Sequence, residues 1–99
     1  MIVARFKVRC RPEQSDEVAA AIAVVEAPSR ALPGVVHFDV ARSLTDPHTF
    51  IVVEVFDDAA ALDRQNAQPE VADVLRILDA GALVGELEWT VWDASTTDG

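Results

Sequence analysis

The chain is poor in the residues that build covalent and metal-dependent sites. Its 99 residues include one cysteine, two histidines and no tyrosine. The single Cys10 excludes an internal disulfide and is typical of a reducing compartment, so we expect a cytoplasmic protein. No apolar run approaches the length of a membrane span, and Met1 leads directly into a strand-like segment, which predicts that no signal peptide is present.

Basic residues are also scarce. Eight Lys and Arg stand against 17 Asp and Glu, and the net charge of −9 disfavours nucleic acid or an anionic membrane as a partner. We interpret the charge as a contribution to solubility. No histidine stands at metal-ligand spacing from Cys10 or from the other histidine, and the glycines form no phosphate-binding loop. We therefore expect no metal or nucleotide site.

Apolar residues, in contrast, make up 51% of the chain, which is enough for one small core. We expect a single domain over residues 1–92, followed by a polar tail over residues 93–99. A domain of this size buries only a modest share of its surface, and association with a second copy would bury more.

The centre of the chain predicts a β-hairpin. Two runs rich in β-branched and aromatic residues, Val35–Arg42 and Thr49–Phe56, flank a turn-forming segment. Alternation of apolar and polar residues predicts two further strands, over residues 2–10 and 86–92. The resulting sheet needs cover on at least one face.

Helical periodicity fills the gaps between these strands. A first helix should begin near Pro12 and run to about residue 31, with a kink or a loosened last turn at Pro28. Asp57 or Asp58 can cap a short helix to residue 67, and Pro69 should begin another that ends at the glycines 81 and 85. The order β-α-β-β-α-β predicts an α+β, ferredoxin-like fold with helices on one face of an antiparallel sheet.

The charges provide a check on this strand order. In a ferredoxin-like sheet the first strand is central, so the row Arg5, Lys7, Arg9 would lie between Glu54 on one side and Glu86 and Glu88 on the other. The face that carries these charges would be left without helices, and we expect a second subunit to cover it. We expect this open face also to present Val35, His37, Ala41, Phe50, Val52, Phe56 and Trp92. Both faces of the third strand are apolar except at Glu54, so its orientation stays open.

Several short motifs occur in an order that resembles the antibiotic biosynthesis monooxygenase (ABM) family. Ser-Arg-Ala-Leu-Pro-Gly occupies residues 29–34, Arg-Ser-Leu-Thr-Asp-Pro residues 42–47, and Glu-Val-Phe-Asp-Asp-Ala-Ala-Ala-Leu residues 54–62, before the helix-opening Pro69. The resemblance covers residues 2–92. It implies a homodimer in which two sheets close into an α+β barrel. It also implies oxidation of quinols, anthrones or related phenols without metal or flavin.

The chain departs from the family pattern at several positions. Gln65 and Glu70 stand where histidines are common, Phe56 replaces a tryptophan, and the tyrosines of the aromatic oxygenases are absent. Haem-degrading relatives need an Asn on the first strand and a His on the last helix. This chain has neither, which argues against haem breakdown.

Two residues of the hairpin are candidate catalytic bases. His37 could accept a proton at neutral pH, or it could be a half-buried interface residue paired with Asp39 or Glu54. Glu54 could be a base with a raised pKa if it is buried among aromatic residues, or it could pair with the basic row. His48 follows Pro47 in the turn, and we expect it to be exposed.

Five further residues are candidates for substrate binding. Gln65 and Asn66 could hydrogen-bond a carbonyl or quinone oxygen, or could satisfy backbone groups at the helix end. Phe38, Phe56 and Trp89 could contact an aromatic ligand, although such residues more often belong to the core.

Two functions from different classes remain open. The first is a cofactor-independent monooxygenase of a small aromatic, with His37 or Glu54 as the base. The second is a non-catalytic dimeric module that binds an apolar ligand or scaffolds a partner. The missing histidines and tyrosines favour the second, and the family resemblance favours the first.

Overall fold

A four-stranded antiparallel sheet forms one layer of the protein, and the helices form the other. In the computed structural model, which describes residues 1–95, the strands are β1 (Ile2–Arg9), β2 (Val35–Arg42), β3 (Thr49–Phe56) and β4 (Glu88–Asp93). They stand in the order β2-β3-β1-β4, with β1 in the interior. This is the ferredoxin-like order that the sequence predicts, and both strands of the hairpin have the predicted bounds.

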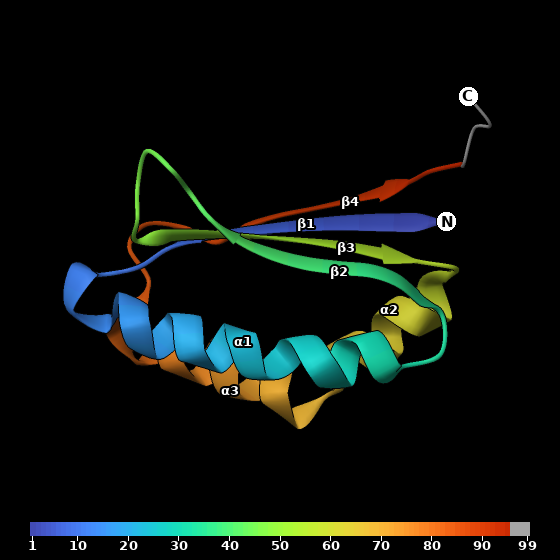
Figure 1. Cartoon of the computed structure of the whole chain (residues 1–99), viewed down its shortest axis with the longest axis horizontal. Coiled ribbons are helices and arrows are strands. Elements are labelled where there is room, and N and C mark those ends of the chain that lie inside the picture. Colours follow the sequence, from blue (N-terminus) through green and yellow to red (C-terminus); the bar gives the residue numbers. More distant parts are fainter. Residues whose placement is uncertain (96–99) are drawn as a thin grey trace.

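The helices occupy one side of the sheet (Figure 1). A turn of 3₁₀ helix at Pro12–Gln14 leads into α1 (Ser15–Ala31), which continues through Pro28 and ends where predicted. The second helical region consists of α2 (Ala59–Asn66), α3 (Pro69–Ile77) and a π-helical turn (Leu78–Ala82). None of these helices is long and apolar enough to cross a membrane.

The main core lies between the sheet and helices α1 and α3. Alternate residues of β1 and β3 point toward the helices, and the apolar stripe of each helix points back. Phe6 and Val52, which are register partners on β1 and β3, face Ile22 and Val25 of α1 and Val74 of α3 across this core. A smaller cluster beneath α2 holds Ala4, Phe56 and Ala61.

The orientation of β3 is the main correction to the sequence prediction. Phe50, Val52, Glu54 and Phe56 face the helices, whereas the open face carries Ile51, Val53 and Val55. Burial of a phenylalanine side chain is worth about 1.5–3 kcal/mol, so turning both phenylalanines inward offsets the cost of burying one carboxyl group. Glu54 therefore does not pair with the basic row on β1, which lies on the other face.

A β-bulge decides the orientation of β2. The register between β2 and β3 shifts between Val35 and His37. Val35 packs against the core instead of the open face, whereas His37 and Ala41 lie on the open face as predicted. Trp92, the partner of Val3 on β1, also lies there. The predicted charge pairing holds for Lys7 and Glu88, whose side-chain charges are 3.9 Å apart.

Helix α2 is anchored at its beginning. The Asp58 side chain accepts a hydrogen bond of 2.9 Å from the backbone N–H of Ala61, which is the predicted helix cap. Arg64 donates to the carbonyl of Pro33 at 2.9 Å and so ties α2 to the start of the hairpin. Because α2 ends at Asn66, this anchoring positions the polar residues of its last turn over the sheet.

Candidate functional site

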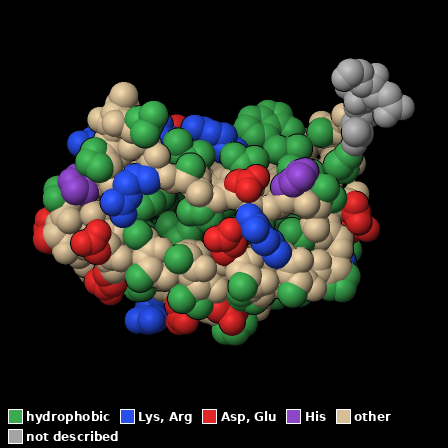
Figure 2. All heavy atoms as spheres, in the orientation of Figure 1, with side chains coloured by type: hydrophobic (Ala, Val, Ile, Leu, Met, Phe, Trp, Pro, Cys, Tyr) green, Lys and Arg blue, Asp and Glu red, His purple; other side chains and the backbone are tan. Residues whose placement is uncertain are grey.

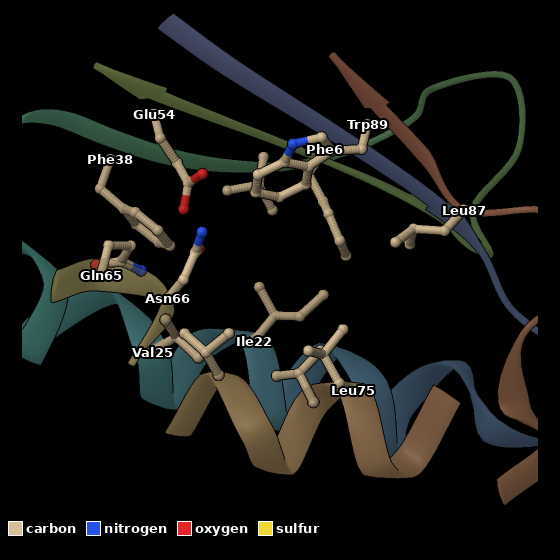
Figure 3. A pocket seen from close by; sticks show the side chains of 13 residues that line it. Phe6, Ile22, Val25, Phe38, Glu54, Gln65, Asn66, Leu75, Leu87 and Trp89 are labelled. Atoms are coloured by element: carbon tan, nitrogen blue, oxygen red, sulfur yellow. The ribbon is translucent and has the colours of Figure 1, made fainter. Parts of the chain in front are cut away.

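A cavity of about 330 Å³ lies between the sheet and the helices. This volume is within the range of small-molecule sites, ~300–1,000 Å³. Figure 3 shows side chains from both layers pointing into it. It is lined by Phe6, Phe38, Val52, Glu54, Leu87 and Trp89 of the sheet side and Ile22, Val25, Gln65, Asn66, Val71, Val74 and Leu75 of the helices. Only three of these side chains, Glu54, Gln65 and Asn66, are polar, and all three lie at the α2 end of the cavity (Figure 3).

Aromatic residues shape the wall on the sheet side. Trp89 of β4 packs edge-to-face on Phe6 of β1, with ring centroids 5.6 Å apart and planes at 86°. Phe38 of β2 is buried, whereas Trp89 is 42% exposed and lies at the rim. The cavity can therefore accept a planar apolar ligand between the sheet and α3, with Trp89 near the entrance.

Glu54 is a buried carboxyl group in this apolar wall. It is 5% exposed, and its strand partners are Ala4 and Phe38. Its Oε2 atom has no hydrogen-bond partner within residues 1–95. Removal of the charged form from water raises the pKa of the Glu54 carboxyl from 4.5 to about 7. The group is thus half protonated near neutral pH and can take up or release a proton there.

The last turn of α2 brings two amides to the same end of the cavity. Gln65 is almost fully buried, and its Oε1 atom accepts a 2.8 Å hydrogen bond from Nε2 of Gln68. Its own Nε2 atom has no partner among the described residues. The Asn66 side chain points up toward the Glu54 carboxyl group, which points down from β3 (Figure 3). A carboxyl group and amide donors therefore converge in an otherwise apolar space.

Five of the seven residues predicted for the site line this cavity, namely Phe38, Glu54, Gln65, Asn66 and Trp89. Phe56 does not line it, because the side chain is fully buried under α2 beside Ala61. His37 lies on the open face, on the other side of the sheet, and is exposed. The structure therefore brings Glu54, and not His37, to the cavity.

His48 is half-buried, where the sequence predicts an exposed side chain. Its Nδ1 atom is 3.0 Å from Oγ of Ser15, and its backbone N–H donates to Asp46 at 3.1 Å. These contacts join the hairpin turn to the beginning of α1, away from the cavity. The two histidines lie at opposite ends of the visible face in Figure 2.

Sequence reasoning missed most of the apolar lining and also Gln68. Ile22, Val71 and Val74 belong to helical stripes, and such stripes give no sign of whether they enclose a filled core or a hollow one. Gln68 stands between two helices, and nothing local distinguishes it from a loop residue. Within residues 1–95, no three His, Cys, Asp or Glu side chains come together as a set that could hold a metal ion.

Comparison with known proteins identifies the family of this chain. The model of the antibiotic biosynthesis monooxygenase family matches residues 1–76. The chain belongs to this family. A search of curated protein sequences gave no match.

Solved structures agree with this ABM fold. The structure of an antibiotic biosynthesis monooxygenase has a TM-score of 0.86 at 22% identity, over 97% of this chain and 100% of its own. A Deinococcus radiodurans protein named for the same family has a TM-score of 0.89 at 18% identity, over 100% and 97% of the two chains. A similarly named Nitrosomonas europaea protein has a TM-score of 0.86 at 15% identity, over 95% and 98%. At these identities the similarity concerns the fold.

Proposed function

We propose that this ABM protein is a cofactor-independent monooxygenase of a small, uncharged aromatic substrate, a phenol, quinol or anthrone. The observation that carries the proposal is Glu54, a carboxyl group inside an apolar cavity whose Oε2 atom has no hydrogen-bond partner among the described residues, and whose pKa is about 7. A general base works best when its pKa lies near the working pH. A structural carboxyl group at this depth would ordinarily be paired with a cation or fully hydrogen-bonded.

The shape and polarity of the cavity support an aromatic substrate. Ten of its thirteen lining residues are apolar, and Phe6, Phe38 and Trp89 offer ring faces and edges for stacking. No lysine or arginine of residues 1–95 lines it, so an anionic substrate would find no counter-charge there. A neutral ring system that carries one or two oxygen atoms fits both the apolar walls and the polar end.

In this proposal Glu54 acts as the base and the amides of Gln65 and Asn66 act as donors to the substrate oxygen. Glu54 takes a proton from the phenol or from the enolisable carbon, and negative charge builds up on the substrate oxygen. Amide N–H groups stabilise that charge strongly where water is excluded. The electron-rich anion then reduces molecular oxygen and binds it at carbon. Loss of water from the resulting hydroperoxide converts the CH₂ group of an anthrone, or a ring C–H of a phenol or quinol, into C=O, so that one oxygen atom enters the product and the other leaves as water.

We further propose that two copies associate through their open faces, as in the barrels of the family. Ile51, Val53 and Val55 form an apolar row along β3 on that face, and Trp92 on the edge strand is 46% exposed. Figure 2 shows hydrophobic side chains, with Lys and Arg side chains between them, along the upper side of the molecule, away from the helices. In such a dimer His37 is an interface residue, which leaves Glu54 as the base.

Oxygen consumption with a panel of anthrones and quinols tests the proposal. We expect wild-type turnover to rise between pH 6 and pH 8, as Glu54 ionises, and to persist after treatment with a chelator. Glu54→Gln keeps the shape of the side chain and removes the base, so turnover should fall by about 10²–10⁴-fold. His37→Ala, on the other face, should retain turnover.

Loss of turnover in His37→Ala with retention in Glu54→Gln would transfer the role of base to the histidine. Binding of the same compounds without any oxygen consumption would instead identify the chain as a non-catalytic binding module.

A further inference from the structure

A chain of three buried or half-buried polar side chains runs behind the cavity. Nε2 of Gln68 donates to Oε1 of Gln65 at 2.8 Å and to Oγ of Ser29 at 3.2 Å. Ser29, on α1, is fully buried, and Gln68 stands at the junction of α2 and α3. The network therefore joins three helices directly behind a residue that lines the cavity.

The two hydrogen bonds account for both hydrogens of the Gln68 amide nitrogen. A primary amide has two N–H donors on nitrogen and an acceptor on oxygen. The Nε2 atom of Gln68 donates one hydrogen to Ser29 and the other to Gln65. Gln65 therefore meets a donor, and not an acceptor, on Gln68. Gln65 must therefore turn its oxygen toward Gln68, and its Nε2 atom is left toward the cavity without a partner.

We propose that Gln68, held by Ser29, is a positioning residue that fixes the direction of the Gln65 amide and thereby makes the site selective for a ligand with an acceptor oxygen. The ligand group is a carbonyl, quinone or phenolate oxygen that accepts from Nε2 of Gln65. A ligand that offers only a donor leaves Nε2 of Gln65 unsatisfied, even where that donor reaches the Glu54 carboxyl group. The proposal rests on the proposed function only in that the cavity binds an aromatic molecule, and it does not depend on turnover.

The alternative is the same network with every amide reversed. Ser29 would then donate to Oε1 of Gln68, which would also accept from Gln65, and the oxygen of Gln65 would face the cavity.

Substitutions of Gln68 separate the two arrangements. A lysine is a donor only and preserves the proposed direction, whereas a glutamate is an acceptor when ionised and forces the reverse. Gln68 is only half-buried, so either charged side chain can reach solvent.

Three rigid probes of nearly identical shape test this selectivity. 9-Fluorenone carries an acceptor only, carbazole a donor only, and fluorene neither. We expect wild type to bind fluorenone about tenfold more tightly than carbazole, the difference that one satisfied hydrogen bond makes. Gln68→Lys should keep this order, and Gln68→Glu should reverse it. Gln65→Leu, which has no amide, should bind all three within about threefold of one another.

Affinities come from titration calorimetry without oxygen, and ¹⁵N NMR follows the side-chain amide of Gln65. Fluorenone should shift that amide resonance in wild type and in Gln68→Lys, but not in Gln68→Glu. A merely structural role of Gln68 would change all three affinities together and would leave their order intact.

Equal affinities in wild type, a preference for carbazole, or no binding of any probe at millimolar concentration overturns the proposal. Selective binding without oxygen consumption on any substrate would leave this inference standing and remove the proposed oxygenase activity.

Discussion

At the residue scale, Glu54 determines what the cavity can do. A carboxyl group among Phe38, Ala4 and Val52 has lost most of its hydration, and in the described part of the chain no positive charge lines the cavity to compensate. The protonated form is therefore favoured up to about pH 7. Burial raises the pKa of the Glu54 carboxyl group and so makes it a usable base. The same burial lowers the free energy of unfolding once the group ionises.

The stability of the protein should decrease as Glu54 ionises. Between pH 4.5 and about 7 the folded protein keeps a proton that the unfolded chain releases, so the free energy of unfolding falls as pH rises through this window. Glu54→Gln has no proton to lose. In urea unfolding, the stability of the variant relative to wild type should increase by about 2 kcal/mol from pH 5.5 to pH 8.5.

The exposed Glu13→Gln serves as the control for this measurement, and its effect should not change over the same pH range. A pH-independent difference between Glu54→Gln and wild type would mean that the Glu54 carboxyl titrates with an ordinary pKa.

At the element scale, the placement of α2 depends on a close approach to the hairpin. Gly34 has a φ of +85°, and a Cβ atom built there would lie 2.7 Å from the Cβ of Ala61. Asp57 donates its backbone N–H to the carbonyl of Gly34 at 2.8 Å, which closes the same junction. Since Gln65 lies one turn beyond Ala61 on α2, this contact sets the height of the polar residues above the sheet.

Gly34→Ala should destabilise the protein more than Gly85→Ala. Both glycines have positive φ, so each substitution should cost about 1–2 kcal/mol of backbone strain, but Gly85 faces open space. At Gly34 the clash with α2 should add about 1–3 kcal/mol. Urea unfolding measures the difference, and ligand affinity should weaken only in Gly34→Ala because Gln65 and Asn66 move with α2. Equal losses in the two variants would show that the contact with α2 carries no strain.

At the scale of the whole molecule, the two faces of the sheet differ in what covers them. One face holds the cavity and the helices, whereas Val53 and its neighbours on β3 have no covering element within residues 1–95. The edge strand β4 is exposed along its length, including Val91 and Trp92. Two such faces packed together would bury both apolar rows, in the manner of aligned sheets.

The proposed dimer should separate when a charge is introduced on the open face. Val53→Glu places a carboxylate on the apolar row, opposite Arg5 on β1. Closing the interface would remove this carboxylate from water, a cost that can exceed the attraction to the neighbouring cation. We expect light scattering at micromolar concentration to give a dimer for wild type and a monomer for Val53→Glu. Val24→Glu is the matched control on the outer side of α1, where the valine is 62% exposed, and it should stay dimeric. A monomeric wild type, or a dimeric Val53→Glu, would contradict the interface.

Local patterns in the sequence were sufficient for the elements and their order. Period-two alternation marks β1 and β4, turn residues bound the hairpin, and Asp58 and Pro69 mark the helix starts where the structure has them. These signals act between near neighbours in the chain, through backbone preference and through the need to bury one side of each element. The family, too, could be predicted from local sequence, because the motifs quoted from residues 29–69 are short and occur in a fixed order.

Only the tertiary structure decided which residues form the site. Both faces of β3 are apolar, so its own sequence does not choose between them. Pairing with β1 and the burial of Phe50 and Phe56 turn Glu54 toward the helices. The bulge in β2 moves Val35 into the core, whereas His37 lies on the open face as the sequence predicts. Ser29 and Gln68 are 39 positions apart in the chain, and only the packing of three helices brings them together behind Gln65.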